Sequence, residues 1–140
     1  ASTNKFKDYA KQVVKNAQVL SAELKKYGYD IVSGGTDNHL FLMDVTSAGL
    51  SGGEAGNLLE KANITVNKNA IPNDTRKPWD PSGIRIGTPA LTTRGMKEDE
   101  MVKVAEYINS VLRSKGEDEV EKIKKEVESF ANKFKIPGIK

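Results

Sequence analysis

Long helix-like apolar stripes near both ends of this 140-residue chain enclose a middle section of short strand-like segments. In the first stripe apolar residues recur every three or four positions, which predicts an amphipathic helix that ends near Gly28. Its members are Phe6, Tyr9, Ala10, Val13, Ala17, Leu20 and Leu24. Two further stripes, separated by Gly116, predict a helix through Met101–Leu112 and a last helix through Val120–Phe134.

Four short segments of the middle section are typical of strands, namely residues 29–33, 38–45, 64–66 and 82–87. The second contains four consecutive apolar residues, Leu40 to Met43, so we expect both of its faces to be covered. Between the second and third strands, Ser51 and Glu54 have the spacing of a capping box ahead of a short helix.

Residues 67–81 are rich in asparagine, lysine and proline, and their prolines exclude a helix. A loop of this length in a compact domain is usually functional or disordered. The whole order of elements predicts an α+β fold: a two-layer small domain with a mostly antiparallel sheet and helices packed on one face.

Charge and composition exclude several classes of function. The chain has 22 Lys and Arg against 19 Asp and Glu, and this small, scattered excess does not predict nucleic-acid binding. No apolar run is long enough for a membrane span, and the polar start lacks a signal peptide, so we expect a cytoplasmic location. With no cysteine and a single histidine, we expect no disulfide, thiol nucleophile or metal site.

Arg85 is the first candidate for a functional residue, because it lies between Ile84 and Ile86 on an apolar strand. A buried guanidinium needs a partner, and its planar fork suits a carboxylate or phosphate ligand. The alternatives are a structural pair with Asp80 or Asp44, or a side chain on a solvent face.

The second candidate is the run Asn67-Lys68-Asn69, whose side chains could bind a polar ligand; from the residues alone we favour a turn. Lys68 lacks the apolar surroundings that would make it a Schiff-base lysine. His39, after the Gly34-Gly35 pair, is interpreted as a structural group. Thr88 and residues 92–95 could hold an anion or cap a helix.

Three segments closely resemble the serine hydroxymethyltransferase family in sequence, order and interval. They are residues 32–40 (Val-Ser-Gly-Gly-Thr-Asp-Asn-His-Leu), 64–69 (Ile-Thr-Val-Asn-Lys-Asn) and 82–95 (Ser-Gly-Ile-Arg-Ile-Gly-Thr-Pro-Ala-Leu-Thr-Thr-Arg-Gly). The resemblance covers about residues 5–114 and, more loosely, a C-terminal helix within 115–140. The family loop often reads Ser-Pro-Phe before a Val-Thr pair, whereas this chain reads Lys77-Pro-Trp-Asp-Pro81.

The resemblance implies the C-terminal domain, residues 1–140, of a fold-type I pyridoxal-phosphate transferase of one-carbon metabolism and amino-acid biosynthesis. Such an enzyme interconverts serine and glycine with tetrahydrofolate as co-substrate. Arg85 matches the arginine that binds the substrate carboxylate, and Asn69 matches a residue that contacts folate. Lys68 and His39 also match family positions, without an assigned step.

The family's cofactor lysine, phosphate-binding groups and pyridinium aspartate belong to a large domain that this chain lacks. The resemblance therefore implies no catalytic, cofactor-binding or metal residue here, and we expect the chain alone to be inactive. It further implies a homo-oligomeric complete enzyme with no nucleic-acid or membrane partner, and an apolar surface that favours self-association of the fragment. The alternatives are an anion- or nucleic-acid-binding α+β module that uses Arg85, Arg94 and Lys68, or an assembly domain.

Overall fold

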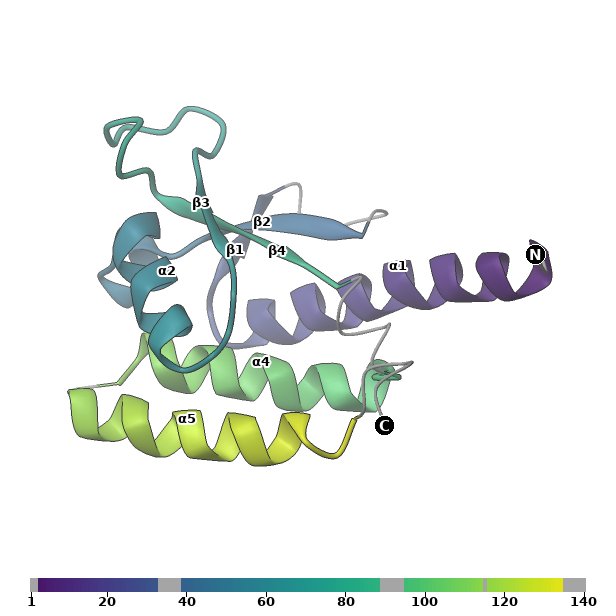
Figure 1. The fold of residues 1–140 in the computed structure, drawn as a ribbon. Coiled ribbons are helices and arrows are strands. Elements are labelled where there is room, and N and C mark those ends of the chain that lie inside the picture. The colour runs from purple at the N-terminus through teal and green to yellow at the C-terminus, as the bar shows by residue number, and fades with distance from the viewer. Residues whose placement is uncertain (1–2, 33–38, 89–94, 115, 135–140) are drawn as a thin grey trace.

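The computed structural model describes residues 3–32, 39–88, 95–114 and 116–134 (Figure 1). The chain begins with helix α1 (Thr3–Lys26), followed by strands β1 (Asp30–Ile31) and β2 (Leu40–Asp44) and a 3₁₀ turn, η2 (Thr46–Ala48). Helix α2 (Gly52–Lys61), strand β3 (Asn67–Asn69) and strand β4 (Gly83–Gly87) come next. Helices α4 (Glu98–Leu112) and α5 (Glu117–Ala131) complete the described chain.

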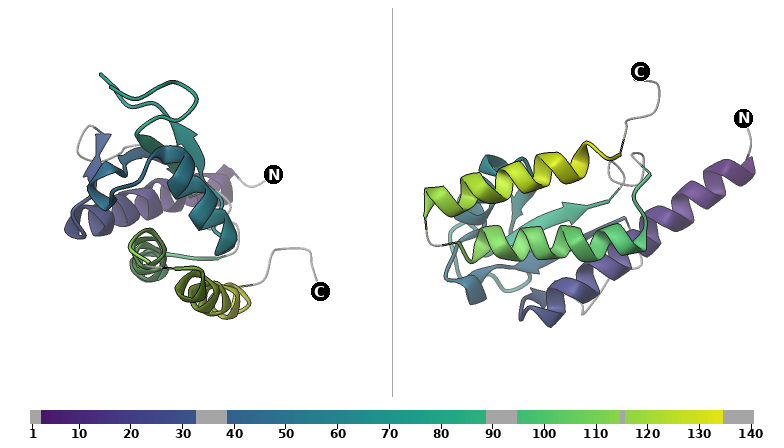
Figure 2. Two further views of the ribbon diagram at one scale, coloured as in Figure 1. Left: turned by 90° about the vertical axis from the view of Figure 1, so that its left-hand side faces the viewer. Right: turned by 90° about the horizontal axis from the view of Figure 1, so that it is seen from below.

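The four strands form one antiparallel sheet in the order β1-β2-β4-β3. Helices α1 and α4 pack together beneath this sheet, α5 packs on α4, and α2 lies at one end of β3 and β4 (Figures 1 and 2). All the described helices therefore gather on one side of the sheet, which confirms the predicted α+β fold class. Within the described ranges, none of the helices combines the length and apolarity needed to cross a membrane.

The core lies between the sheet and the helices. Phe41 and Met43 of β2 and Ile84 and Ile86 of β4 are buried on the helix side. From the helices they meet other fully or nearly fully buried side chains, among them Leu20, Leu24, Leu59, Met101, Ala105 and Ile108. On β2 burial alternates along the strand, with Leu40 and Leu42 only half-buried. The expectation that both faces of this strand are covered is therefore wrong for the described chain.

The structure also corrects the third strand. Ile64 and Val66 were expected in a strand, but β3 begins only at Asn67 and occupies the residues for which we favoured a turn. Pairing decides the position, because Asn67, Lys68 and Asn69 lie opposite β4, whereas Ile64 and Val66 pack their side chains against the core. Tertiary contacts here override the intrinsic strand preference of β-branched residues.

Hydrogen bonds at the helix starts follow the sequence pattern. Ser51 Oγ accepts from the Glu54 N–H (3.1 Å) and Glu54 Oε1 accepts from the Ser51 N–H (3.0 Å), which confirms the capping box. Helix α4 carries Glu98, Asp99 and Glu100 in its first turn, as expected for the positive end of a helix dipole. Helix α5 ends at Ala131, so Phe134 lies beyond it, although its ring still contacts Phe130 (5.4 Å between centroids).

Two fully buried polar side chains fix α1 against the rest of the domain. Asn16 donates from Nδ2 to the Met96 carbonyl (2.9 Å) and accepts from Gln12 Nε2 (2.8 Å). Thr88, directly after β4, donates from Oγ1 to the Val13 carbonyl (2.7 Å). Both groups are satisfied, as buried polar groups must be, so they set the position of α1 along β4.

Replacing Ile84 by alanine tests the central place of β4 in the core. Ile84 is fully buried, so Ile84→Ala should lower the free energy of unfolding by about 2–5 kcal/mol. Urea unfolding followed by circular dichroism measures the change. The control is Val102→Ala on the exposed face of α4, expected to change stability by no more than about 0.5 kcal/mol. Equal losses for the two variants would contradict this description of the core.

Candidate functional site

The sheet face opposite the helices carries most of the polar side chains of the strands. Side chains of residues directly opposite each other on antiparallel strands project from the same face. One row across this face contains Leu42, Arg85 and Asn67, and the next contains Asp30, Asp44, Gly83 and Asn69. In the part of the chain that the structure describes, no helix covers this face (Figures 1 and 2). We call this set of residues the open sheet face.

Arg85 is exposed, whereas its neighbours Ile84 and Ile86 are buried. Neither acidic residue that we considered as its partner pairs with it: Asp44 accepts from Thr46 N and Oγ1 (2.8 and 2.6 Å), and Asp80 pairs with Arg76. The Arg85 guanidinium makes no hydrogen bond or ion pair with any described residue. Its guanidinium is therefore on a solvent-facing surface of this chain, with its donors available to a ligand.

Asn69 lies on the same face as Arg85, one row along the sheet. Asn69 pairs with Gly83, which is two residues before Arg85, so Asn69 and Arg85 are diagonal neighbours. Diagonal neighbours in antiparallel sheets are roughly 7–8 Å apart. Its side chain donates from Nδ2 to the Ala70 carbonyl (2.8 Å), which fixes the amide. The structure thus brings together the two residues singled out from the sequence, with Asn67 directly opposite Arg85.

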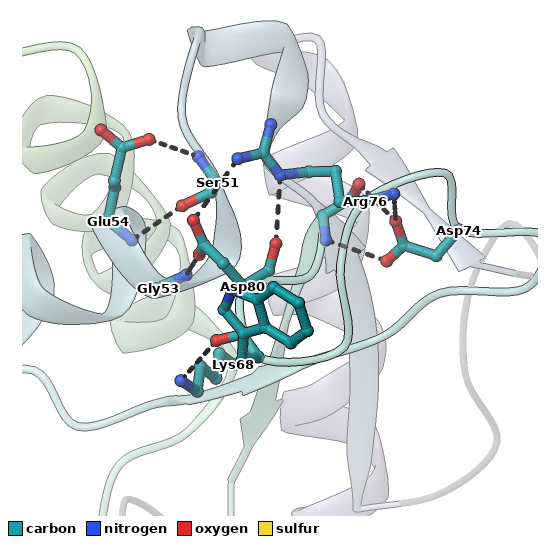
Figure 3. Close-up of polar contacts among 9 residues, drawn as sticks. Ser51, Gly53, Glu54, Lys68, Asp74, Arg76 and Asp80 are labelled. Atoms are coloured by element: carbon teal, nitrogen blue, oxygen red, sulfur yellow. Dashed lines mark hydrogen bonds and ion pairs between the residues drawn. The ribbon is translucent and has the colours of Figure 1, made fainter.

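The segment between β3 and β4, residues 70–82, is an ordered loop organised by two carboxylates (Figure 3). Asp74 Oδ2 accepts from the N–H groups of Ile71 (3.2 Å) and Ser82 (2.9 Å). Its Oδ1 accepts from the Arg76 N–H (2.9 Å) and the Ser82 hydroxyl (2.8 Å). These bonds, those from the Ser82 backbone first, hold the pKa of Asp74 well below its usual range.

Asp80 joins the far side of the loop to α2. Its Oδ1 accepts from the Gly53 N–H (3.1 Å), and its carboxylate forms an ion pair with Arg76 (3.4 Å). A hydrogen bond from the Ser51 hydroxyl contributes most to holding the pKa of Asp80 below its usual value. Gly52 donates to the Pro81 carbonyl (2.6 Å), and a Cβ at Gly52 would lie 2.2 Å from the Gly83 carbonyl oxygen. Only glycine allows α2 to approach β4 this closely.

Among the described residues, the other candidates from the sequence, Lys68, His39 and Thr88, add no further group to the open sheet face. Lys68 is exposed and donates to the Trp79 carbonyl (2.8 Å). The carbonyl of His39 accepts from the Thr88 N–H (3.0 Å). Gly34 and Gly35, together with Arg94 and the threonines that precede it, lie outside the described residues.

Sequence reasoning missed Asp74 and the paired glycines at the start of α2, and it considered Asp80 only as a possible partner of Arg85. Asp74 follows Pro72-Asn73, a composition typical of turns in which an aspartate accepts bonds from nearby backbone N–H groups. That signal was present in the sequence. Nothing in the local sequence pairs Asp80 with Gly53, which is 27 positions away.

The described residues offer no evident place for a metal or a covalently held cofactor. They contain no group of three or more His, Cys, Asp or Glu side chains able to hold a metal ion. No lysine is among the buried polar residues of the described chain, which are Asn16, Ser21, Ser51, Ser82 and Thr88. The open sheet face instead combines the exposed guanidinium of Arg85 with carboxylate and amide side chains.

The fold defines the chain as a small α+β domain in which no described helix covers one polar face of the sheet. A family model described as "Serine hydroxymethyltransferase" matches residues 1–108. Serine hydroxymethyltransferases of Acidobacterium capsulatum and Halorhodospira halophila are 56% and 50% identical to the chain over 134 residues, which is 95% of the chain in each case. The chain therefore belongs to the serine hydroxymethyltransferase family. It spans only 31% and 32% of the length of these two relatives.

Replacing Asp74 by asparagine tests the loop's hydrogen-bond centre. Both carboxylate oxygens of Asp74 accept from backbone N–H groups. In Asp74→Asn the side-chain NH₂ group would replace one of these oxygens and would face a backbone N–H, so two donors would meet. Because the pKa of Asp74 is lower in the folded than in the unfolded chain, its stabilisation is present above the unfolded value of about 3.9 and is lost as the pH falls below it.

Asp74→Asn should therefore be less stable than the parent at pH 7, and the difference should shrink below about pH 4. Urea unfolding at a series of pH values measures this. Asp8→Asn, which removes an exposed carboxylate on α1, controls for the change in net charge. A stability difference that stays constant from pH 7 to pH 3 would show that Asp74 does not act as its hydrogen bonds indicate.

Proposed function

We propose that residues 1–140 are the C-terminal domain of a serine hydroxymethyltransferase that transfers a one-carbon unit between serine and tetrahydrofolate. Membership of the family supports this proposal, as does the coverage, because the chain accounts for about a third of its relatives' length. The observation that carries it is the placement of Arg85: exposed and unpaired among the described residues, on a strand whose neighbouring residues are buried.

In this proposal Arg85 binds the carboxylate of serine or glycine. A guanidinium presents parallel N–H donors that match two carboxylate oxygens, and such bidentate bonds are both strong and directional. Ile84 and Ile86 anchor the strand on either side of Arg85, so the Cα of the arginine is held rigidly while its side chain remains free to bind. Once the rest of the enzyme covers the open sheet face, the lower local dielectric strengthens the charge pair.

Asn69 is proposed to contact tetrahydrofolate. Its amide donates to Ala70, and Oδ1 accepts no hydrogen bond from a described residue, so this oxygen can accept from an N–H group of the folate ring. Asn69 also begins the loop of residues 70–82, which then borders the folate side of the site. The amino acid and the folate would thus be bound by neighbouring rows of one sheet face.

Pyridoxal phosphate is the cofactor implied by the family, and the residues described here do not fit it. A lysine that forms an imine is activated by a desolvated pocket or a neighbouring cation, and none of the described lysines is buried. We therefore assign the cofactor to the remainder of a longer enzyme and derive no step through it. This chain contributes substrate binding and orientation.

Substitution of Arg85 in the complete enzyme tests its proposed role. Arg85→Ala should lower kcat/KM for serine by about 30- to 1000-fold, the equivalent of about 2–4 kcal/mol for a charge-assisted pair. Steady-state kinetics provide the measurement. Lys122→Ala removes an exposed cation from α5 and should leave kcat/KM unchanged. Because Arg85 is exposed, its replacement should barely change the stability of the domain. Kinetics equal to those of the parent enzyme would show that Arg85 does not bind the substrate carboxylate.

The isolated chain should neither retain pyridoxal phosphate nor turn over serine. The cofactor would be mixed with the purified 140-residue chain and then removed by gel filtration. We expect no imine absorption band in the protein fraction and no glycine product. A stable band abolished by substitution of one lysine, with turnover of serine, would show instead that this chain contains the cofactor site.

A further inference from the structure

We propose that Asp80 is a positioning residue whose carboxylate holds the loop of residues 70–82 against the start of α2 and so fixes the folate side of the site. This inference rests on the proposed function, since it concerns how the chain presents Asn69 to tetrahydrofolate. It assigns Asp80 no direct contact with substrate.

The contacts of Asp80 join the loop both to itself and to the start of α2 (Figure 3). One oxygen accepts from the Gly53 N–H at the N-terminus of α2 (3.1 Å), where the helix dipole favours a negative charge. The other faces the Arg76 guanidinium within the loop (3.4 Å), and Arg76 Nε also donates to the Asp80 carbonyl (3.1 Å). A single aspartate therefore closes the loop on itself and attaches it to a helix.

Few other contacts could hold this part of the loop. Residues 75–79 are all exposed, and Trp79 is 69% exposed, so little apolar burial anchors them. Asp74 secures the side of the loop next to Ile71 and Ser82. On the opposite side, the attachment consists of Asp80, the bond from Lys68 Nζ to the Trp79 carbonyl (2.8 Å) and the bond from the Gly52 N–H to the Pro81 carbonyl (2.6 Å).

The Lys68 bond links this attachment to the binding face. Lys68 lies between Asn67 and Asn69 on β3, which is an edge strand of the sheet. Movement of residues 79 and 80 would therefore release a contact of β3, the strand that carries Asn69. Core packing does not depend on Asp80, because the hydrogen bond from Gly52 to Pro81 still holds the last residues of the loop, next to β4, against α2.

Gly53 provides a second way to disturb the same contact. A Cβ built at Gly53 would lie 2.6 Å from Asp80 Oδ1, so Gly53→Ala must displace the carboxylate. Alanine favours helix formation over glycine, so this variant should keep or gain helix stability while losing the contact. Gly56→Ala is the matched control, since a Cβ there meets no atom within 4 Å.

The first experiment measures loop order in the 140-residue chain by trypsin cleavage. The Arg76–Lys77 bond is a trypsin site in the middle of the loop, whereas the next bond, Lys77–Pro78, is resistant. Asp80→Ala and Gly53→Ala should be cut at Arg76 about tenfold faster or more than the parent, because local opening controls such cleavage. Asp80→Asn, which keeps an acceptor for Gly53, should be intermediate, and Gly56→Ala should match the parent.

The second experiment measures kinetics of the same variants in the complete enzyme. Asp80→Ala and Gly53→Ala should raise KM for tetrahydrofolate about five- to thirtyfold and leave KM for serine unchanged, with partial rescue by Asp80→Asn. Parent-like cleavage at Arg76, or faster cleavage with an unchanged KM for tetrahydrofolate, would overturn the proposal. If Asp80→Ala does not fold, the cleavage rate and the KM for tetrahydrofolate of Gly53→Ala test the proposal on their own. Failure of the proposed function would appear separately, as absence of hydroxymethyltransferase activity in the parent enzyme.

Discussion

The antiparallel pairing of β4 with both β2 and β3 is the constraint on which the rest of the structure depends. It places Ile84 and Ile86 on the side of the helices, where they join the core, and it therefore directs Arg85 to the other side. Alternation of side chains along a strand makes these two outcomes inseparable. A largely buried strand thus presents an exposed guanidinium on the opposite face of the sheet.

Glycines and carboxylates then determine how the neighbouring segments approach this strand. Gly52 lets α2 lie directly against the entry to β4, and Gly53 leaves room for Asp80 at the end of the helix. Asp74 collects the N–H groups of a loop that has no regular structure of its own. Because most of its residues are exposed, the loop is held together by side-chain acceptors rather than by burial.

Sequence periodicity predicted the long helices, the capping box and β4, because each depends on local spacing. The uncommon arginine between two isoleucines was also visible as a candidate, and the family resemblance is confirmed by the comparisons. The predicted position of the third strand was wrong, because pairing of residues 67–69 with β4 outweighed the apolar character of Ile64 and Val66. The contact between Asp80 and Gly53 could not be predicted, because it depends on how a loop returns to a helix distant in sequence.

The freedom of the Arg85 side chain has a consequence for affinity. With no partner among the described residues, its long side chain retains its rotamers, and immobilising such a chain costs up to about 2 kcal/mol of conformational entropy. Any ligand that captures the guanidinium must offset that cost unless neighbouring groups restrict the rotamers beforehand. Affinity at this position is therefore set jointly by the charge of the ligand and by the steric confinement that surrounds the arginine in the assembled protein.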